Sequence, residues 1–183
     1  FYRACRDHDV KPIIGTEAYM AHETRYERFS RRGRMDDSGG ETDTGKKLMY
    51  HLTLLAENNV GYKNMIQLAS RAFLEGYYYK PRVDWEVLDN HSEGVIATTG
   101  CLGGHVLQSL VRDDFQGAVD KAGRLQEIFG KGNLFVELQD HGLPEQLKTN
   151  PDLVNLAKQI GAPLVATNDS HYVKQEDSHS HDA

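Results

Sequence analysis

Cysteine is scarce in this sequence, with Cys5 and Cys101 the only two among 183 residues. Two cysteines cannot form the disulfide framework of a small secreted protein, so we expect a reducing compartment such as the cytoplasm. The sequence also has no apolar run long enough to span a membrane and no secretory signal at its N-terminus. A glycine-rich phosphate loop, a nucleophile elbow and a paired CxxC motif are absent as well, which removes the commonest local signatures of catalysis.

The composition is typical of a globular protein, with 39% hydrophobic and 26% charged residues and a net charge of −6. The length suits one domain, residues 1–183, with a sizeable core. The negative charge argues against tight independent binding to nucleic acid. Nine histidines is a high count for this length and favours metal or acid–base chemistry. No methionine begins the chain, and residues 1–5 read like the middle of a helix, so we expect a fragment of a larger protein.

Short apolar runs alternate with helical patterns along the chain. The expected strands are residues 13–19, 50–56, 94–100, 134–138 and the run that begins at Leu164. The expected helices lie at residues 1–10, 59–73, 85–88, 105–111, 114–129 and 151–160, the last with Asn150 as its cap. This alternation predicts parallel pairing and an α/β architecture. Five strands do not close an eight-stranded barrel, which again indicates an incomplete domain.

Residues 21–47 differ from the rest, because arginines alternate there with acidic residues and almost no aliphatic side chains occur. We interpret this segment as a solvated, mobile insertion loop. Contact between its basic half and a phosphate backbone is the less favoured alternative.

The stretch from Leu164 to Tyr172 reads as a buried strand that ends in Asp-x-His. Side chains alternate along a strand, so Asp169 and His171 should point the same way, roughly 6–7 Å apart at the backbone. A carboxylate beside an imidazole makes half of a metal site. The alternative is an aspartate that orients or caps a neighbouring group, followed by an incidental histidine.

Further metal-ligand types lie in or just after the other expected strands, namely Glu17, His51 and Cys101. Enzymes with parallel sheets place their chemistry at such positions. Each residue has a simpler interpretation. Glu17 could form a salt bridge at the rim, His51 could be a hydrogen-bonded core imidazole, and Cys101 could be an inert buried thiol.

A competing cluster, Glu137 with Asp140 and His141, ends the fourth expected strand. We expect Glu137 to face the site as a hydrogen-bond partner of a ligand. The segment from Asp140 to Gly142 reads as a turn.

These runs together carry a family resemblance. Residues 11–19, 51–56, 99–104, 135–139 and 166–172 resemble the PHP (polymerase and histidinol phosphatase) domain, in the version found in bacterial replicative DNA polymerase III alpha subunits. The resemblance implies a distorted, seven-stranded TIM-like barrel that is incomplete here. It also implies a polynuclear metal centre. The implied ligands in this chain are Glu17, His51, Cys101, Asp169 and His171, and the remaining family ligands should precede Phe1.

The resemblance further implies a function. The metal ions would be divalent, with zinc favoured by the cysteine and manganese or iron as alternatives. The parent protein would be a DNA-directed DNA polymerase used in replication, and its PHP domain a 3′–5′ exonuclease that proofreads the primer end. Its partners would be DNA and other replicase subunits. The fragment alone should be inactive. A silent, metal-braced structural module and a histidinol-phosphatase-like phosphoesterase remain as alternatives.

Overall fold

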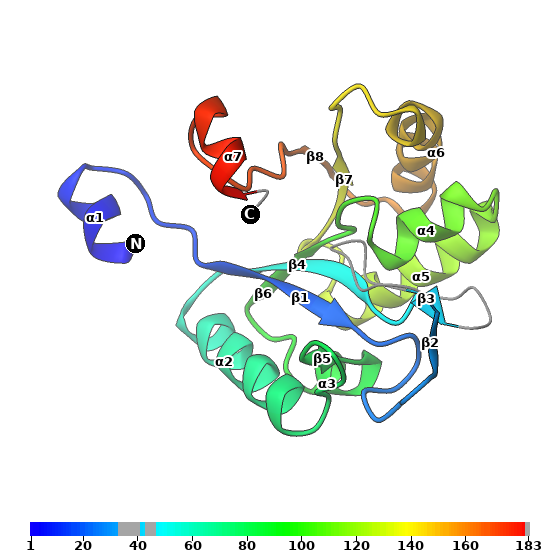
Figure 1. Cartoon of the computed structure of the whole chain (residues 1–183), viewed down its shortest axis with the longest axis horizontal. Coiled ribbons are helices and arrows are strands. Elements are labelled where there is room, and N and C mark those ends of the chain that lie inside the picture. Colours follow the sequence, from blue (N-terminus) through cyan, green and yellow to red (C-terminus); the bar gives the residue numbers. More distant parts are fainter. Residues whose placement is uncertain (33–40, 43–46, 182–183) are drawn as a thin grey trace.

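The protein folds around a six-stranded mixed sheet, seen in a computed structural model that describes residues 1–32, 41–42 and 47–181 (Figure 1). The strand order is β5-β1-β4-β6-β7-β8. The strands are β1 (Gly15–Met20), β4 (Tyr50–Ala56), β5 (Arg82–Val83), β6 (Val95–Thr98), β7 (Leu134–Leu138) and β8 (Leu164–Ala166). A separate pair, β2 (Arg31–Arg32) and β3 (Glu41–Thr42), lies within the segment predicted as an insertion, of which residues 33–40 and 43–46 are outside the described residues.

Four expected strands are present as β1, β4, β6 and β7, whereas the last one is only the three-residue β8 and β5 was not predicted. The prediction of uniformly parallel pairing is wrong. Strands β6, β7 and β8 are parallel, whereas β4 runs antiparallel to both of its neighbours, β1 and β6. A parallel neighbour needs a long crossover connection, usually a helix. The described residues between β1 and β4 contain no helix, so β4 returns alongside β1. Because β4 runs in this direction, His51, near its start, lies at the end of the sheet where β1 and β6 terminate.

The described residues form seven α-helices, of which the three longest pack against the sheet. They are α1 (Tyr2–Asp7), α2 (Asn59–Leu74), α3 (Trp85–Asn90), α4 (His105–Val111), α5 (Phe115–Phe129), α6 (Pro144–Ile160) and α7 (Ser178–His181), with a 3₁₀ turn η1 (Gln175–Asp177). Helix α2 packs against β4, β5 and β6, while α5 and α6 pack against β7 (Figure 1). No helix of the described part of the chain is long and apolar enough to cross a membrane.

The core lies between these helices and the sheet. Its buried side chains include Leu54, Leu68, Leu88, Val95, Ala97, Leu125, Leu134, Val136, Leu153 and Leu156. The sheet ends at β8 without closing on itself in the described residues. The result is the expected α/β architecture of an incomplete PHP-type barrel.

Polar side chains fix where the helices begin. Asn58, Asp84 and Asp114 each accept a hydrogen bond from backbone N–H groups in the first turn of α2, α3 and α5 respectively. Each such cap is worth about 1 kcal/mol. Gly161 ends α6 in the left-handed conformation, at φ 67°. The sequence predicts Asp84 and Gly161 at these positions, and the structure has them there. It leaves Asn58 or Asn59 for α2 and Asp113 or Asp114 for α5, and the caps in the structure are Asn58 and Asp114.

The predicted start of the sixth helix is wrong. The sequence predicts a cap at Asn150 and a first turn at Pro151, but α6 begins at Pro144 and contains Pro151 in its interior. The first half of α6 buries polar side chains, Gln146 and Thr149, instead of aliphatic ones. The hydrophobic pattern of the sequence therefore does not reveal the first half of α6. Pro151 is on the exposed side, where loss of one backbone hydrogen bond is tolerated.

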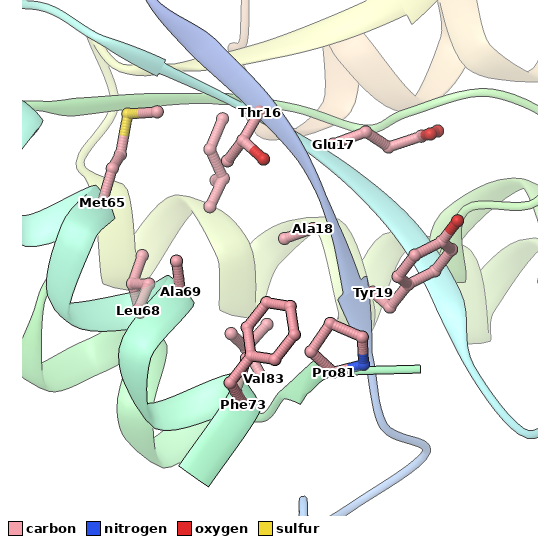
Figure 2. Close-up of a pocket in the computed structure, with 12 residues that line it drawn as sticks. Thr16, Glu17, Ala18, Tyr19, Met65, Leu68, Ala69, Phe73, Pro81 and Val83 are labelled. Carbon is pink, nitrogen blue, oxygen red and sulfur yellow. The ribbon is translucent and has the colours of Figure 1, made fainter. Parts of the chain in front are cut away.

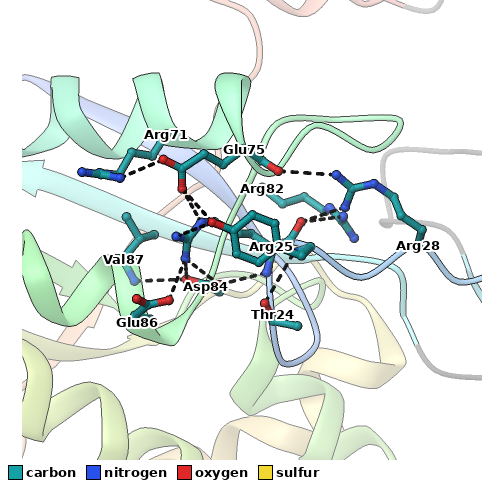
Figure 3. Close-up of polar contacts among 10 residues, drawn as sticks. Thr24, Arg25, Arg28, Arg71, Glu75, Arg82, Asp84, Glu86 and Val87 are labelled. Carbon is teal, nitrogen blue, oxygen red and sulfur yellow. Dashed lines mark hydrogen bonds and ion pairs between the residues drawn. The ribbon is translucent and has the colours of Figure 1, made fainter.

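Residues 21–32 are anchored to the body by buried arginines (Figure 3). Arg25, 5% exposed, donates hydrogen bonds to Asp84 and to Glu75 at the end of α2. Arg82 is fully buried and donates to the backbone carbonyls of Arg25, Gly76 and Glu27. The described start of the predicted insertion therefore includes buried, ion-paired residues and is not wholly solvated.

Candidate metal centre

Glu17 and His51 meet on one face of the sheet because of the antiparallel register of β1 and β4. Tyr19 pairs with His51 and Glu17 pairs with Thr53, so all four side chains lie on the same face. Glu17 and His51 are diagonal neighbours in this arrangement, within reach of long side chains. Nδ1 of His51 lies 2.9 Å from Oε1 of Glu17. Figure 2 shows Glu17 and Tyr19 pointing away from α2 on the same side of β1.

Cys101 joins these two residues from the loop that follows β6. Its Sγ lies 3.4 Å from His51 Nδ1. Two glycines bring the loop this close. Gly100 adopts φ 78°, which favours glycine, and a Cβ on Gly103 would lie 3.1 Å from the imidazole of His51. The backbone N–H of His51 also donates to the carbonyl of Gly103 at 3.0 Å, so the loop and the strand are held together.

Glu17, His51 and Cys101 form a group whose potential ligand atoms all lie within 4.8 Å of one another. The group offers oxygen, nitrogen and sulfur donors, a set that suits zinc and several transition metals. Nε2 of His51 is buried and has no hydrogen-bond partner among the described residues. The ring atom that faces the other two donors is Nδ1, so the case for an ion rests on the three donors themselves and their short separations. The three residues therefore fit a metal ion.

The electrostatics of the group couple proton and metal binding. Burial disfavours the imidazolium of His51, but the hydrogen bonds and charges of Cys101 and Glu17 raise the pKa of His51 to about 10. The hydrogen bond from His51 in turn lowers the pKa of Glu17, against the opposing effect of burial. The charge of His171 contributes to the lowered pKa of Glu17. A metal ion that binds His51 must displace its proton.

Asp169 and His171 lie outside this three-residue group, in a loop after β8. The prediction that they alternate along a buried strand is wrong. Strand β8 ends at Ala166 and is largely exposed, and Asp169 has φ 45°, a left-handed conformation that turns the chain. Nδ1 of His171 contacts the carbonyl oxygen of Asp169 at 2.7 Å, so a turn replaces the extended geometry.

The three residues of the competing cluster at the end of β7 make separate contacts and do not form one group. Asp140 accepts a hydrogen bond from the N–H of Gly142 at 3.0 Å, as the predicted turn requires. The ring of His141 contacts the carbonyl oxygen of Asn168 at 3.0 Å, next to Asp169. Glu137 is buried and accepts hydrogen bonds from the hydroxyl groups of Thr98, at the end of β6, and Thr167, just after β8.

Sequence reasoning missed Tyr19. Its ring packs edge-on against the imidazole of His51, with centroids 5.4 Å apart. The side chain shares the face of Glu17, but only the antiparallel register of β1 and β4 places it against His51. The residue spacing within a single strand does not contain that information.

Oxygen, nitrogen and sulfur donors are gathered at one end of this α/β sheet. The fold and these donors define the chain as a candidate metal-binding protein. The chain belongs to the PHP domain family, which matches residues 1–141. The sequence-based family assignment is therefore confirmed.

Curated relatives of the chain are DNA polymerase subunits. It is 45% identical over 182 residues to the DNA polymerase III subunit alpha of Thermus aquaticus and 46% identical over 182 residues to that of Deinococcus radiodurans. The corresponding protein of Treponema pallidum is 42% identical over 182 residues. These alignments cover 100% of this chain but only 14%, 13% and 14% of the three relatives. The chain thus spans about one seventh of the length of the relatives it matches.

Proposed function

We propose that this chain is the PHP region of a replicative DNA polymerase III alpha subunit, and that this region acts in the intact protein as a metal-dependent 3′–5′ exonuclease. The grouping of Glu17, His51 and Cys101 within 4.8 Å carries the exonuclease proposal. Similarity to polymerase subunits along the whole chain supports the polymerase assignment. The polymerase would copy DNA, and the PHP region would proofread the primer end.

The proposed ligands are Glu17, His51, Cys101, Asp169 and His171. The first three are already grouped, and the charge of His171 reaches Glu17. Thiolate and imidazole donors favour zinc, whereas the carboxylates also suit manganese or iron. When bound, clustered divalent ions lower the pKa of a bound water toward 7 and neutralise charge on the scissile phosphate.

The side chains would prepare the site in distinct ways. Glu17 is held ionised by its hydrogen bond with His51 and is ready to bind a cation. The Cys101 loop holds the backbone of His51 and restricts its ring through Gly103. Tyr19 packs edge-on against that imidazole and limits its rotation. These contacts orient the donors before any ligand arrives, which reduces the cost of binding.

The partners in this proposal are the 3′ end of a DNA primer and the other subunits of the replicase. The chain's net charge of −6 indicates that DNA would reach the site through the rest of the polymerase and not through this region alone. A cytoplasmic location belongs to the same proposal, because the similar proteins are DNA polymerase subunits.

Trimming of primed DNA by the whole polymerase that contains this chain tests the proposal. Asp169→Asn and His171→Ala should each abolish removal of a mismatched 3′ nucleotide. His179→Ala is the matched control, because His179 is also an exposed histidine close to the C-terminal end of the chain. Trimming that persists in both variants contradicts the exonuclease assignment.

A structural role for the metal is the second candidate. Glu17, His51 and Cys101 belong to three different segments, namely β1, β4 and the loop after β6. An ion bound by all three would join those segments without doing chemistry. In that case a chelator should lower the melting temperature of the polymerase while a trimming assay detects no nuclease activity. An unchanged melting temperature argues against metal bracing.

A further inference from the structure

Glu137 is a buried carboxylate surrounded by neutral donors. It lies in β7 and is 5% exposed. The hydroxyl of Thr98 donates to its Oε2, while the hydroxyl of Thr167 and the amide of Gln139 donate to its Oε1, the latter at 3.0 Å. A buried carboxylate is expensive unless several hydrogen bonds satisfy it. Three donors converge here on one side chain.

The two hydroxyl donors belong to the segments that carry proposed metal ligands. Thr98 ends β6, and its Oγ1 also accepts a hydrogen bond at 3.2 Å from Gly100, which directly precedes Cys101. Thr167 follows β8 and lies two residues before Asp169. Glu137 therefore bridges the Cys101 loop and the loop at residues 167–171.

Strand pairing does not require this side chain. The backbone ladder already joins β6 to β7 and β7 to β8, with Glu137 opposite Val165. The carboxylate instead reaches Thr98, the last residue of β6, and Thr167, just after β8. The backbone N–H of Thr167 also donates to the carbonyl of Leu138 at 3.1 Å, so the side-chain contact adds to a backbone contact at this point. Networks of this kind fix one geometry when every member is satisfied.

A second contact holds the same loop. His141 binds the carbonyl oxygen of Asn168 and is itself fixed by Gln146, whose side chain contacts both its ring and its backbone N–H. Thr167 and Asn168 are therefore both attached to the end of β7. Asp169 comes next and turns the chain at φ 45°.

We propose that Glu137 is a positioning residue that links the Cys101 loop to the loop at residues 167–171, so that Asp169 and His171 face Glu17, His51 and Cys101. This inference rests on the proposed ligand set. Glu137 touches no metal in this role. Partners of metal ligands commonly change metal affinity by about 10- to 100-fold when they are removed.

Thr167→Val and Thr167→Ser form a matched pair for the test. Valine keeps the shape of threonine but removes the donor to Glu137, whereas serine retains it. Cobalt(II) is the probe, titrated into the metal-free, full-length polymerase that contains this chain and followed by its visible absorption. Thr167→Val should weaken cobalt binding about 10- to 100-fold, and Thr167→Ser should stay within about threefold of the wild type.

Thr98→Val tests the coupling through Glu137 from the opposite side. It removes a donor near Cys101 without touching residues 167–171 directly. If Glu137 links the two loops, backbone hydrogen exchange at residues 167–171 of the metal-free protein should accelerate in Thr98→Val, as it should in Thr167→Val. Glu137→Gln, which puts a donor where a carboxylate oxygen accepts, should act in the same direction.

Several results would overturn the inference. They are wild-type cobalt affinity in Thr167→Val, equal losses in the valine and serine variants, and unchanged exchange at residues 167–171 in Thr98→Val. A lowered melting temperature with intact cobalt affinity would leave Glu137 with a merely structural role, which also contradicts the inference. Because neither readout needs nuclease activity, failure of the exonuclease proposal is seen separately, as cobalt binding without trimming of primed DNA.

Discussion

Asp84 caps helix α3 and, with the same carboxylate, binds the buried guanidinium of Arg25. Its Oδ1 accepts a hydrogen bond from the N–H of Val87 at 3.0 Å and lies 2.9 Å from Nη1 of Arg25. Glu75 at the end of α2 binds the same arginine at 2.7 Å (Figure 3). One cation thus ties residues 21–32 to the end of one helix and the start of another.

Arg25→Met should destabilise the protein by roughly 3 kcal/mol, because it leaves the carboxylate of Asp84 buried without its counter-ion. Urea denaturation measures the change. Lys148→Met is the control, since Lys148 pairs with Asp113 at 2.7 Å but both side chains are substantially exposed. Its effect should stay below about 1 kcal/mol. Equal effects of the two substitutions would contradict the anchoring role of Arg25.

Gly61→Ala should strongly destabilise the protein. A Cβ at this position in the first turn of α2 would lie 1.6 Å from the carbonyl oxygen of Gly94, so the helix would have to move away from the turn before β6. Such overpacking costs about 2 kcal/mol or more. Gly123→Ala in α5 is the control, because a Cβ there meets no atom within 4 Å. It should stabilise by roughly 0.5–1 kcal/mol, and thermal melting of both variants tests the difference.

Stability should fall in acid because of His105. Burial between aromatic rings, helped by the charge of Lys121, lowers the pKa of His105 to about 3. In the unfolded chain the same histidine titrates near 6.5. As the pH drops from 6.5 toward 3, His105 is therefore protonated in the unfolded state but stays neutral in the folded state. The contribution of neutral His105 to the free energy of unfolding is therefore lost at roughly 1.4 kcal/mol per pH unit between pH 6.5 and pH 3, and it is constant above pH 6.5.

His105→Gln should flatten this dependence. Urea denaturation at pH 7.5 and pH 5 gives the slope for each protein. The comparison does not depend on the stability of the variant at neutral pH. A variant whose stability changes with pH as steeply as that of the wild type would remove His105 as the cause.

Cys101→Ser should change which metal the intact protein that contains this chain prefers. Replacing a thiolate by a hydroxyl removes the soft donor, so zinc affinity should fall about tenfold or more while manganese affinity changes much less. Competition titration with a metal indicator measures both. Cys5→Ser is the control, because Cys5 is a free cysteine in α1 and lies outside the group. Equal zinc affinity in both variants would contradict a sulfur ligand at Cys101.

The sequence predicts the local features of this fold well. Strands β4 and β7 have the expected bounds because apolar residues dominate both runs, and the caps at Asn58, Asp84 and Asp114 follow from side-chain chemistry. The direction of β4 could not be predicted, since it depends on the connection between strands and not on the residues of β4 itself. The same limit hid Tyr19, which reaches His51 only through that antiparallel register.

The loop that carries Asp169 and His171 shows a different limit. Period-two alternation holds only while the backbone stays extended, and here it stops at Ala166. Aspartate tolerates the left-handed conformation at residue 169, so the turn leaves no glycine as a marker. The two hydroxyl groups that donate to Glu137 come from Thr98 in β6 and from Thr167 just after β8, and only the tertiary structure brings them together.

The wide separation of Glu17, His51 and Cys101 along the chain has a consequence for folding. No short segment contains two of them, so the unfolded polypeptide offers a metal ion no comparable site. Binding then acts almost entirely on the native state and shifts the equilibrium by mass action. At a free metal concentration 100 times the dissociation constant, this linkage adds roughly 2.7 kcal/mol to the free energy of unfolding. The β-sheet must form before the three residues are close together, and a bound ion would then stabilise the folded sheet.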